Sequence, residues 1–291
     1  MSKSVQTRID EAYPHLSKGH RRIADFIRGN YEKAAFMTAA KLGSTTGVSE
    51  STVVRFASNL GYDGYPELQK CLQETVKSHL TSVQRMEVAA SRFAGADMLD
   101  KALTADIEMI KSTRETVSRE AFSKSVEAIN RAEKIYVLGV RSAASLASFA
   151  AFYLNFVYDN VVLVDTSSSS EIFEQMYRIG ERDVCIAISF PRYSNQTLSA
   201  LRFAAGRGAV IISVTDGESS PIAEYATYLL TARSSMVSFV DSLVAPLSLI
   251  NALIAGAAAE RSEQVVSNLR TLEEIWDEYR VYRKNDGEEP R

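Results

Sequence analysis

Residues 183–197, DVCIAISFPRYSNQT, join an apolar run to a loop rich in polar side chains. The run DVCIAI has the length and apolar content of a strand that is buried on both faces of a parallel sheet. The segment SNQT has the small polar residues that begin helices. We therefore predict a strand, a loop and a helix in succession. In open α/β sheets such a loop, at the carboxyl end of a strand, is where small ligands bind.

Four further apolar runs of strand length lie between residues 134 and 232, and the runs from 134 to 216 alternate with segments of helical length. They are KIYVLGV (134–140), NVVLVDT (160–166), GAVIISVTD (208–216) and YATYLLTA (225–232). This alternation is typical of βαβ units. We expect an α/β three-layer sandwich with a five-stranded parallel sheet, and a core or dimer helix within the apolar stretch 237–260.

The segments that follow the first four strands are rich in hydroxyl groups. They read GVRSAAS (139–145), DTSSSSE (165–171), SFPRYSNQT (189–197) and TDGESSP (215–221). Serine and threonine donors before helices suit a phosphate or a polyol, although each single serine is also explained as a helix cap. Only one glycine stands at the first of these turns, so a dinucleotide-binding fingerprint is absent and no cofactor is expected.

The front of the chain has a different pattern, and its informative part is GSTTGVSESTVVRFASNLG (43–61). Gly47 supplies a turn, Ser49 is placed to cap a helix, and Gly61 ends that helix. A second short helix precedes the turn and is capped by Thr38. The apolar residues of the later helix share one face: Val53, Phe56, Ala57 and Leu60.

Two short helices joined by a glycine-containing turn form the helix-turn-helix pattern. On this interpretation the residues that meet base edges and phosphates in the major groove are Lys41, Ser49, Glu50, Ser51, Thr52 and Arg55. Residues 1–85 carry 12 basic and 8 acidic side chains, a mildly positive balance that suits DNA. The alternative is a helical bundle whose polar face is simply solvated.

The segment from Leu16 to Leu72 resembles the N-terminal domain of RpiR-type bacterial transcriptional regulators. The resemblance is carried by RRIADFI (21–27), GVSESTVVRF (47–56) and LGYDGYPELQ (60–69). It implies an all-α helix-turn-helix domain that binds a double-stranded DNA operator. It also implies a dimer, which places two recognition helices in neighbouring major grooves.

From about Phe122 to Glu260 the chain resembles the SIS (sugar isomerase) domain, through IYVLGV, the pair AIS and SNQT, and GAVIISVTDGESSPIAEYATYLL. The resemblance implies a phosphosugar ligand, which in RpiR-type regulators is an effector. The residues expected to bind it are Arg141, Ser142, Ser189, Arg192, Tyr193, Ser194 and Thr197. Two features depart from the family pattern: Arg141 replaces a glycine, and FPRY (190–193) is an insertion.

The predicted segments are a helix-turn-helix domain (1–77), a helical linker (78–119), a SIS-like domain (120–284) and a disordered tail (285–291). Within the linker, one amphipathic helix has its apolar residues at helical spacing: Leu99, Leu103, Ile107 and Ile110. This helix is expected to pack on the second domain, which is the more common use, or on a partner subunit.

Catalysis is not expected, because all three histidines (15, 20 and 79) lie in the first eighty residues. Glu171 and Glu224 remain as possible bases. The two cysteines have no metal-ligand spacing, so no metal is expected. The chain lacks a long apolar run and is predicted to be cytoplasmic, without membrane contact.

We therefore predict a homodimeric or homotetrameric regulator of carbohydrate-metabolism genes that senses a sugar phosphate or a related anionic metabolite. The alternative is a phosphosugar isomerase, or a ligand-binding module whose helical front contacts another protein.

Overall fold

The computed structural model describes residues 5–77, 81, 83–86, 97–164, 169–235 and 240–283. The chain divides into two compact units: the first includes the chain up to Ala96, and the second begins at Asp97 and holds most of the rest. The predicted tail 285–291 and much of the predicted flexible stretch 78–97 lie outside the described residues.

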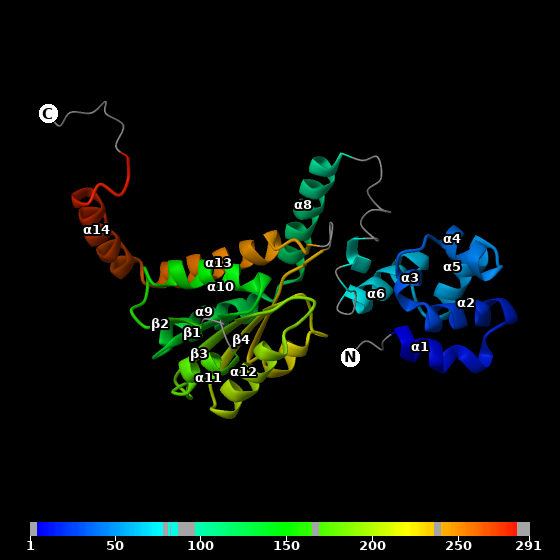
Figure 1. The fold of residues 1–291 in the computed structure, drawn as a ribbon, viewed down its shortest axis with the longest axis horizontal. Coiled ribbons are helices and arrows are strands. Elements are labelled where there is room, and N and C mark those ends of the chain that lie inside the picture. The colour runs from blue at the N-terminus through cyan, green and yellow to red at the C-terminus, as the bar shows by residue number, and fades with distance from the viewer. Residues whose placement is uncertain are drawn as a thin grey trace. The chain divides into compact units, whose positions relative to one another are not determined.

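The first unit is helical (Figure 1). Its helices are α1 (Val5–Ala12), α2 (Lys18–Gly29), α3 (Tyr31–Ala35), α4 (Ala39–Thr46), α5 (Glu50–Asn59) and α6 (Tyr65–Lys77). Helix α5 packs against α2, α4 and α6. Five of these helices each contribute a fully buried large side chain to this core: Ile9, Ile23, Leu42, Phe56 and Leu68. The inward residues predicted for 49–60 are all buried as well.

The second unit contains a five-stranded sheet, and all of its strands are parallel. The strands are β1 (Ile135–Gly139), β2 (Val161–Val164), β3 (Val184–Ile188), β4 (Val210–Thr215) and β5 (Tyr228–Thr231). Their order in the sheet is β2-β1-β3-β4-β5. Each strand falls within one of the five predicted apolar runs, so the predicted α/β class is confirmed.

Helices cover both faces of this sheet (Figure 1). On one face lie α9 (Arg119–Arg131), α10 (Ser142–Leu154) and α13 (Val244–Glu260), which pack on Ile135 and Val137 of β1. On the other face lie α11 (Ser169–Met176) and α12 (Asn195–Gly206), next to Tyr136 and Leu138. Alternate residues of β1 thus enter opposite cores, as the two-residue period of a strand requires. The apolar stretch 237–260 supplies α13, a core helix.

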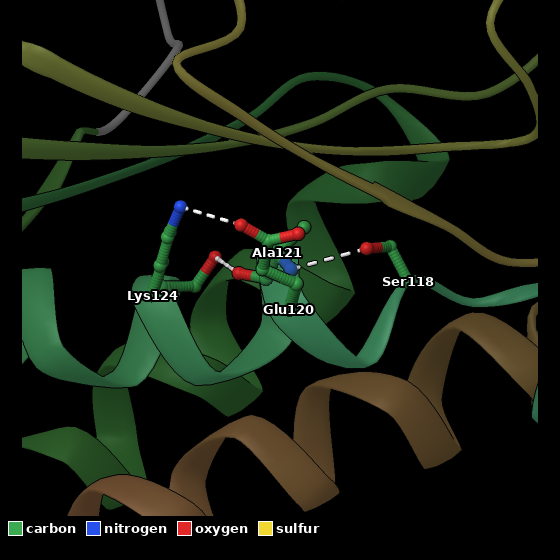
Figure 2. Close-up of polar contacts among 5 residues, drawn as sticks. Ser118, Glu120, Ala121 and Lys124 are labelled. Carbon is green, nitrogen blue, oxygen red and sulfur yellow. Dashed lines mark hydrogen bonds and ion pairs between the residues drawn. The ribbon is translucent and has the colours of Figure 1, made fainter.

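Helix α9 begins at a serine cap, as Figure 2 shows. The Ser118 hydroxyl accepts a hydrogen bond from the Ala121 N–H at 3.1 Å, which satisfies one of the free N–H groups at the helix start. One turn further, the Lys124 ammonium pairs with the Glu120 carboxylate at 2.6 Å and lowers the pKa of that carboxyl group. Both side chains are exposed, so the pair is a minor contribution beside the packing of α9 on α13.

Helix α8 (Met98–Thr116) lies in the predicted linker and packs on α13 within the second unit. Its buried residues are Met109 and Thr113, and the Thr113 hydroxyl accepts a hydrogen bond from the Arg233 N–H at 2.8 Å. The predicted apolar stripe is exposed by 69, 55, 52 and 37%: Leu99, Leu103, Ile107 and Ile110. The helix therefore packs on the second unit, as predicted, but it does so through the neighbouring face that carries Met109 and Thr113, and the apolar stripe itself stays exposed.

The second unit ends with α14 (Ser262–Glu278), which has no buried residue. No helix in the part of the chain that the structure describes has the length and apolar character needed to cross a bilayer.

Candidate functional site

The turn between α4 and α5 has the predicted caps. The Thr38 hydroxyl accepts from the Lys41 N–H at 3.2 Å and begins α4, and the Ser49 hydroxyl accepts from the Thr52 N–H at 3.3 Å and begins α5. Gly47 ends α4 in the left-handed conformation, with φ 70° and ψ 36°, which glycine adopts without steric cost. The helix-turn-helix prediction is confirmed at this turn.

A second glycine allows α4 and α5 to approach closely. A Cβ atom at Gly43 would lie 2.9 Å from the Val48 carbonyl oxygen and 3.3 Å from the Glu50 nitrogen. These are backbone atoms of the turn, which do not move as freely as the end of a side chain. Gly43 therefore fixes how the second helix of the motif crosses the first.

The six predicted DNA-binding residues lie around this turn, five at the start of α5 and Lys41 on α4. All are exposed except Thr52, which is half-buried. The Ser49 hydroxyl oxygen lies 2.9 Å from that of Ser51 and 2.8 Å from that of Thr52. Arg55 donates from Nε to the Ser51 carbonyl at 3.2 Å and from its guanidinium to the Ser51 hydroxyl at 3.3 Å. The start of α5 is thus a compact surface of hydroxyl groups with one guanidinium over it.

His20, on α2, lies behind this surface and was not predicted to contribute. Its ring meets the Phe56 ring edge-on, with centroids 5.6 Å apart. Burial, and secondarily the Arg55 charge, lower the pKa of His20 below its ordinary value of 6.5. The imidazole is therefore neutral near pH 7. The helical periodicity of α2 carries no signal for this contact, because the partner ring is 36 residues away in the sequence.

In the second unit, the crevice expected for a ligand lies where β1 and β3 are neighbours. From β1 the chain moves to β2 on one side, whereas β3 leads to β4 and β5 on the other, so this pair is the switch point of the sheet. The strand ends are in register, with Gly139 opposite Ile188. All seven predicted effector-binding residues follow one of these two strands. The sheet therefore brings both predicted segments together at the carboxyl end of its strands.

The end of β1 turns sharply into α10. A Cβ atom at Gly139 would lie only 2.4 Å from the Ala143 carbonyl oxygen, so the helix start rests against the strand end. Arg141 follows with φ 60° and ψ −123°, a conformation that side-chain-bearing residues rarely adopt. It precedes the first residue of α10 without making a capping hydrogen bond, and both it and Ser142 are exposed.

The loop after β3 is anchored at both ends of the FPRY insertion. Ser189, 5% exposed, continues the pairing with β4 through a 3.1 Å hydrogen bond from its N–H to the Val214 carbonyl. Phe190 is 7% exposed and packs in the core on the α10 face. Arg192 is exposed and has φ 69°. The Tyr193 hydroxyl donates to the Asp216 carboxylate at 2.6 Å, which ties the loop to the end of β4.

Asp216 belongs to a group of hydroxyl and carboxylate contacts that the sequence did not single out. Its carboxylate also accepts from the Thr215 hydroxyl at 3.1 Å, and the Thr215 and Ser220 hydroxyl oxygens lie 2.7 Å apart. Burial, followed by the Asp216 charge, raises the pKa of Tyr193, so its hydroxyl stays protonated as a donor. Only the polar composition of TDGESSP (215–221) signalled this contact.

Helix α12 begins with the two remaining predicted residues. The Ser194 hydroxyl accepts from the Gln196 N–H at 3.2 Å, so it caps the helix, as the alternative interpretation of each serine allowed. Thr197, in the first turn, is 1% exposed, and its hydroxyl oxygen has no hydrogen-bond partner among the described residues. A buried hydroxyl at a helix N-terminus can complete its hydrogen bonding with an anionic oxygen.

The acids considered for catalysis lie in ordinary helical positions. Glu171 is in the first turn of α11, and Glu224 is exposed in the short 3₁₀ helix Pro221–Tyr225. Among the described residues, no three histidine, cysteine, aspartate or glutamate side chains are grouped as metal ligands would be.

Together, the two units define a class of protein: a helix-turn-helix domain on the same chain as a parallel α/β domain in which polar loops follow the carboxyl ends of β1 and β3. Comparison with family models agrees with both halves. Residues 3–79 match the helix-turn-helix domain of the rpiR family, and residues 128–256 match the SIS domain. The chain belongs to the RpiR family of helix-turn-helix transcriptional regulators, as its resemblance predicted.

Several known proteins are similar over most of the chain. The regulator HexR of Escherichia coli is 22% identical, covering 96% of this chain and 95% of its own. An uncharacterised regulator of Haemophilus influenzae is 24% identical over 79% of this chain and 80% of its own. Among solved structures, Vibrio vulnificus NanR in complex with ManNAc-6P has a TM-score of 0.58 at 20% identity, covering 94% of this chain and 98% of that one.

The sugar isomerase domain of an RpiR transcription factor from Sphaerobacter thermophilus is also similar in structure. It has a TM-score of 0.55 at 29% identity and covers 60% of this chain and 97% of that chain. These structures share the fold described above.

Proposed function

We propose that the protein is a transcriptional regulator of carbohydrate-metabolism genes that binds a DNA operator through residues 1–77 and a phosphorylated sugar through residues 120–284. It acts in the cytoplasm as a homodimer or homotetramer, and ligand binding changes its affinity for DNA without chemical turnover. A ligand shifts such an equilibrium only by its different affinity for the two states.

The observation that best supports binding of a phosphorylated sugar is the buried Thr197 hydroxyl. A buried hydroxyl without a partner costs about 1–3 kcal/mol, so a protein gains little by keeping one unless something binds it. This hydroxyl is in the first turn of α12, where backbone N–H groups and the helix dipole favour negative charge. A phosphate oxygen satisfies both features. NanR, similar in fold over nearly the whole chain, was solved with ManNAc-6P, which supports a phosphorylated sugar as the ligand.

The proposal that the protein binds DNA rests on the exposed start of α5. Hydroxyl groups and a guanidinium at the N-terminal end of the second helix of this motif suit base edges and phosphates in a major groove. Two copies of the domain place two such helices about 34 Å apart, one turn of DNA. The operator is therefore expected to contain two related half-sites.

A gel-shift experiment with the upstream region of the gene's own operon tests the DNA side. Arg55→Ala is expected to weaken operator binding about tenfold or more, because a lost base or phosphate contact costs about 1–3 kcal/mol. Arg131→Ala, an exposed arginine of α9 in the other unit, is the matched control and should bind like the parent protein. If no sequence binds more tightly than random DNA at physiological salt, the DNA side of the proposal fails.

Thr197→Val tests the ligand side, because it removes the hydroxyl and keeps the shape. It should abolish the thermal shift produced by sugar phosphates while leaving operator binding intact and stability equal or higher. Thr113→Val is the contrasting control: its hydroxyl accepts a hydrogen bond from the Arg233 N–H, so this variant should lose stability and keep the ligand response. An unchanged response in Thr197→Val would place the ligand elsewhere.

A further inference from the structure

Helix α8 carries an apolar stripe that stays exposed in the described part of the chain. This α8 stripe consists of Leu99, Leu103, Ile107 and Ile110, and the first three of these side chains are more than half exposed. The helix meets α13 through the face that carries Met109 and Thr113, and Figure 1 shows its first half extending away from α13. The stripe leaves on the order of 300 Å² of apolar surface in contact with water, a size that marks interaction sites on soluble proteins.

Two oppositely charged residues border the α8 stripe on the side away from α13. A helix turns by about 100° per residue, which places Asp100 and Lys111 along the same edge of the stripe, one in each half of the helix. The Lys111 ammonium pairs with the Glu108 carboxylate at 2.8 Å, but both side chains are more than half exposed. Such a surface pair contributes little, and a lysine has three donors, so Lys111 can also bind a second carboxylate.

An antiparallel pair of α8 helices, related by a two-fold axis, brings these charges together. With the axis between residues 105 and 106, Asp100 of one copy is level with Lys111 of the other, because both lie equally far from the axis, and symmetry forms this pair twice. The same axis sets Asp97, which caps the helix, level with Arg114. One register therefore matches two acids at the start of the helix with two bases in its second half.

The apolar residues fit the same register. Leu103 of one copy is level with residue 108 of the other, so its side chain enters the space between Ile107 and Ile110, as knobs enter holes between paired helices. Asp106 lies beside the axis in both copies, on the edge nearest α13, and its carboxylate accepts a hydrogen bond from the Ser242 hydroxyl of its own unit at 2.6 Å. The remaining charges of the helix lie on the face away from the stripe: Lys101, Glu108 and Glu115.

Helix α14 is the other helix that exposes several apolar residues in the described part of the chain, among them Val266, Leu269 and Ile275. It carries five acidic side chains and one basic side chain, so two copies of α14 would bring mainly like charges together. Helix α8 has the opposite charges that a second copy of itself needs, and it has them at matching distances from one axis.

We propose that the α8 stripe is an interface between two copies of this chain, in which the two α8 helices pack antiparallel and Asp100 of each copy pairs with Lys111 of the other. This inference rests on the homodimer or homotetramer of the proposed function, and it identifies the surface through which the copies meet. The stripe supplies the apolar centre of the interface and the charged edge its polar rim, the usual arrangement between protein subunits.

Charge reversal in the full-length protein tests this register. Asp100→Lys and Lys111→Asp each set like charges opposite each other twice, so each should weaken self-association about tenfold or more in sedimentation experiments. The double variant should restore self-association, and so should a one-to-one mixture of the two single variants, because each copy then supplies the charges that the other needs. Asp100 and Lys111 lie about 16 Å apart on their own helix, so only contacts between copies explain this rescue.

A second pair of reversals controls for net charge. Glu127→Lys and Arg131→Glu change exposed residues of α9 by the same amounts of charge, and each alone should assemble like the parent protein. Rescue that reflected only the attraction of oppositely charged chains would appear in their mixture as well. Stronger association of this mixture than of the parent protein would therefore overturn the pairing of Asp100 with Lys111.

An apolar substitution tests the stripe itself. Leu103→Arg places a charge at the centre of the proposed interface and should reduce the assembly by one step, from dimer to monomer or from tetramer to dimer. Leu269→Arg on α14 is the matched control, because it also replaces an exposed leucine, and it should assemble like the parent protein. Circular dichroism should show both variants folded, since neither side chain is buried within its own unit. The reverse result would place the interface on α14.

The outcomes distinguish this inference from the function on which it rests. If the parent protein assembles and neither the charge reversals nor Leu103→Arg change its assembly, the α8 interface is wrong, while operator and sugar-phosphate binding stand. If these variants lose thermal stability but assemble normally, the stripe is covered within its own chain, and the inference fails. If the parent protein is a monomer at micromolar concentration, the assembly in the proposed function is itself wrong, and the inference with it.

Discussion

The two units build their functional surfaces in opposite ways. In the first, all six candidate residues come from residues 41–55, and two caps and a glycine turn place them. In the second, the candidates come from loops that follow β1 and β3. These strands are separated in the chain by α10, β2 and α11, and the loops meet only because the sheet places the two strands side by side. The first surface is local, whereas the second depends on the tertiary fold.

The largest expected effects come from substituting two glycines, each of which allows a close backbone approach at one of the two functional surfaces. Gly139→Ala should destabilise the second unit by about 3 kcal/mol, since a Cβ atom would lie 2.4 Å from the Ala143 carbonyl oxygen. Gly43→Ala should cost the first unit only about 1 kcal/mol, because its contact is looser and alanine favours the helix. Denaturant unfolding of the full chain, followed by probes in each unit, measures both.

Gly206→Ala is the control, since a Cβ atom there meets no other group within 4 Å. It should leave the transition of the first unit at the parent value and give the second unit at most a slight gain, because alanine favours the helix. A larger loss from Gly43→Ala than from Gly139→Ala would contradict the view that the second unit depends more on close tertiary contact.

Removing the Tyr193 hydroxyl should have a smaller effect on stability, and this effect should be confined to the second unit. Tyr193→Phe should cost about 1–2 kcal/mol, because the Asp216 carboxylate loses a short hydrogen bond while it keeps its contact with Thr215. Tyr153→Phe on α10, an exposed residue, should cost almost nothing. Thermal unfolding of the two variants compares them, and equal losses would show that the loop is not anchored through Asp216.

The pH dependence of the first unit is expected to be the smallest effect. The pKa of His20 is lowered on folding, so as pH falls through about 6.5 the unfolded chain takes up a proton before the folded one does. Stability should therefore fall as the pH drops below about 7 and level off once the folded state is also protonated. Unfolding of His20→Gln, compared with His15→Gln, measures this: the first variant should lose that part of the pH dependence, and the second should keep it.

Much of the fold could be predicted from the sequence because the signals are local. The turn at Gly47, the caps at Thr38 and Ser49, and the five apolar runs depend on neighbouring residues and on the periods of helix and strand. The same signals correctly predicted the helix α8 and its packing on the second unit, but they did not identify the face that makes the contact. Periodicity identifies an apolar face, but it cannot tell whether that face or the adjacent one, with Met109 and Thr113, will meet another helix.

By itself, the sequence determined the two fold classes, the family and the segments that could bind DNA or an anion, because composition, spacing and capping act over a few residues. Only the tertiary structure decided which side chains are engaged at the sheet edge. The strand order brought Arg141 and Arg192 to the same end of the sheet, and the Tyr193 hydroxyl bonds Asp216 just after β4. Packing buried the Thr197 hydroxyl without a hydrogen-bond partner among the described residues. Each of these depends on contacts between residues far apart in the chain, which no local pattern encodes.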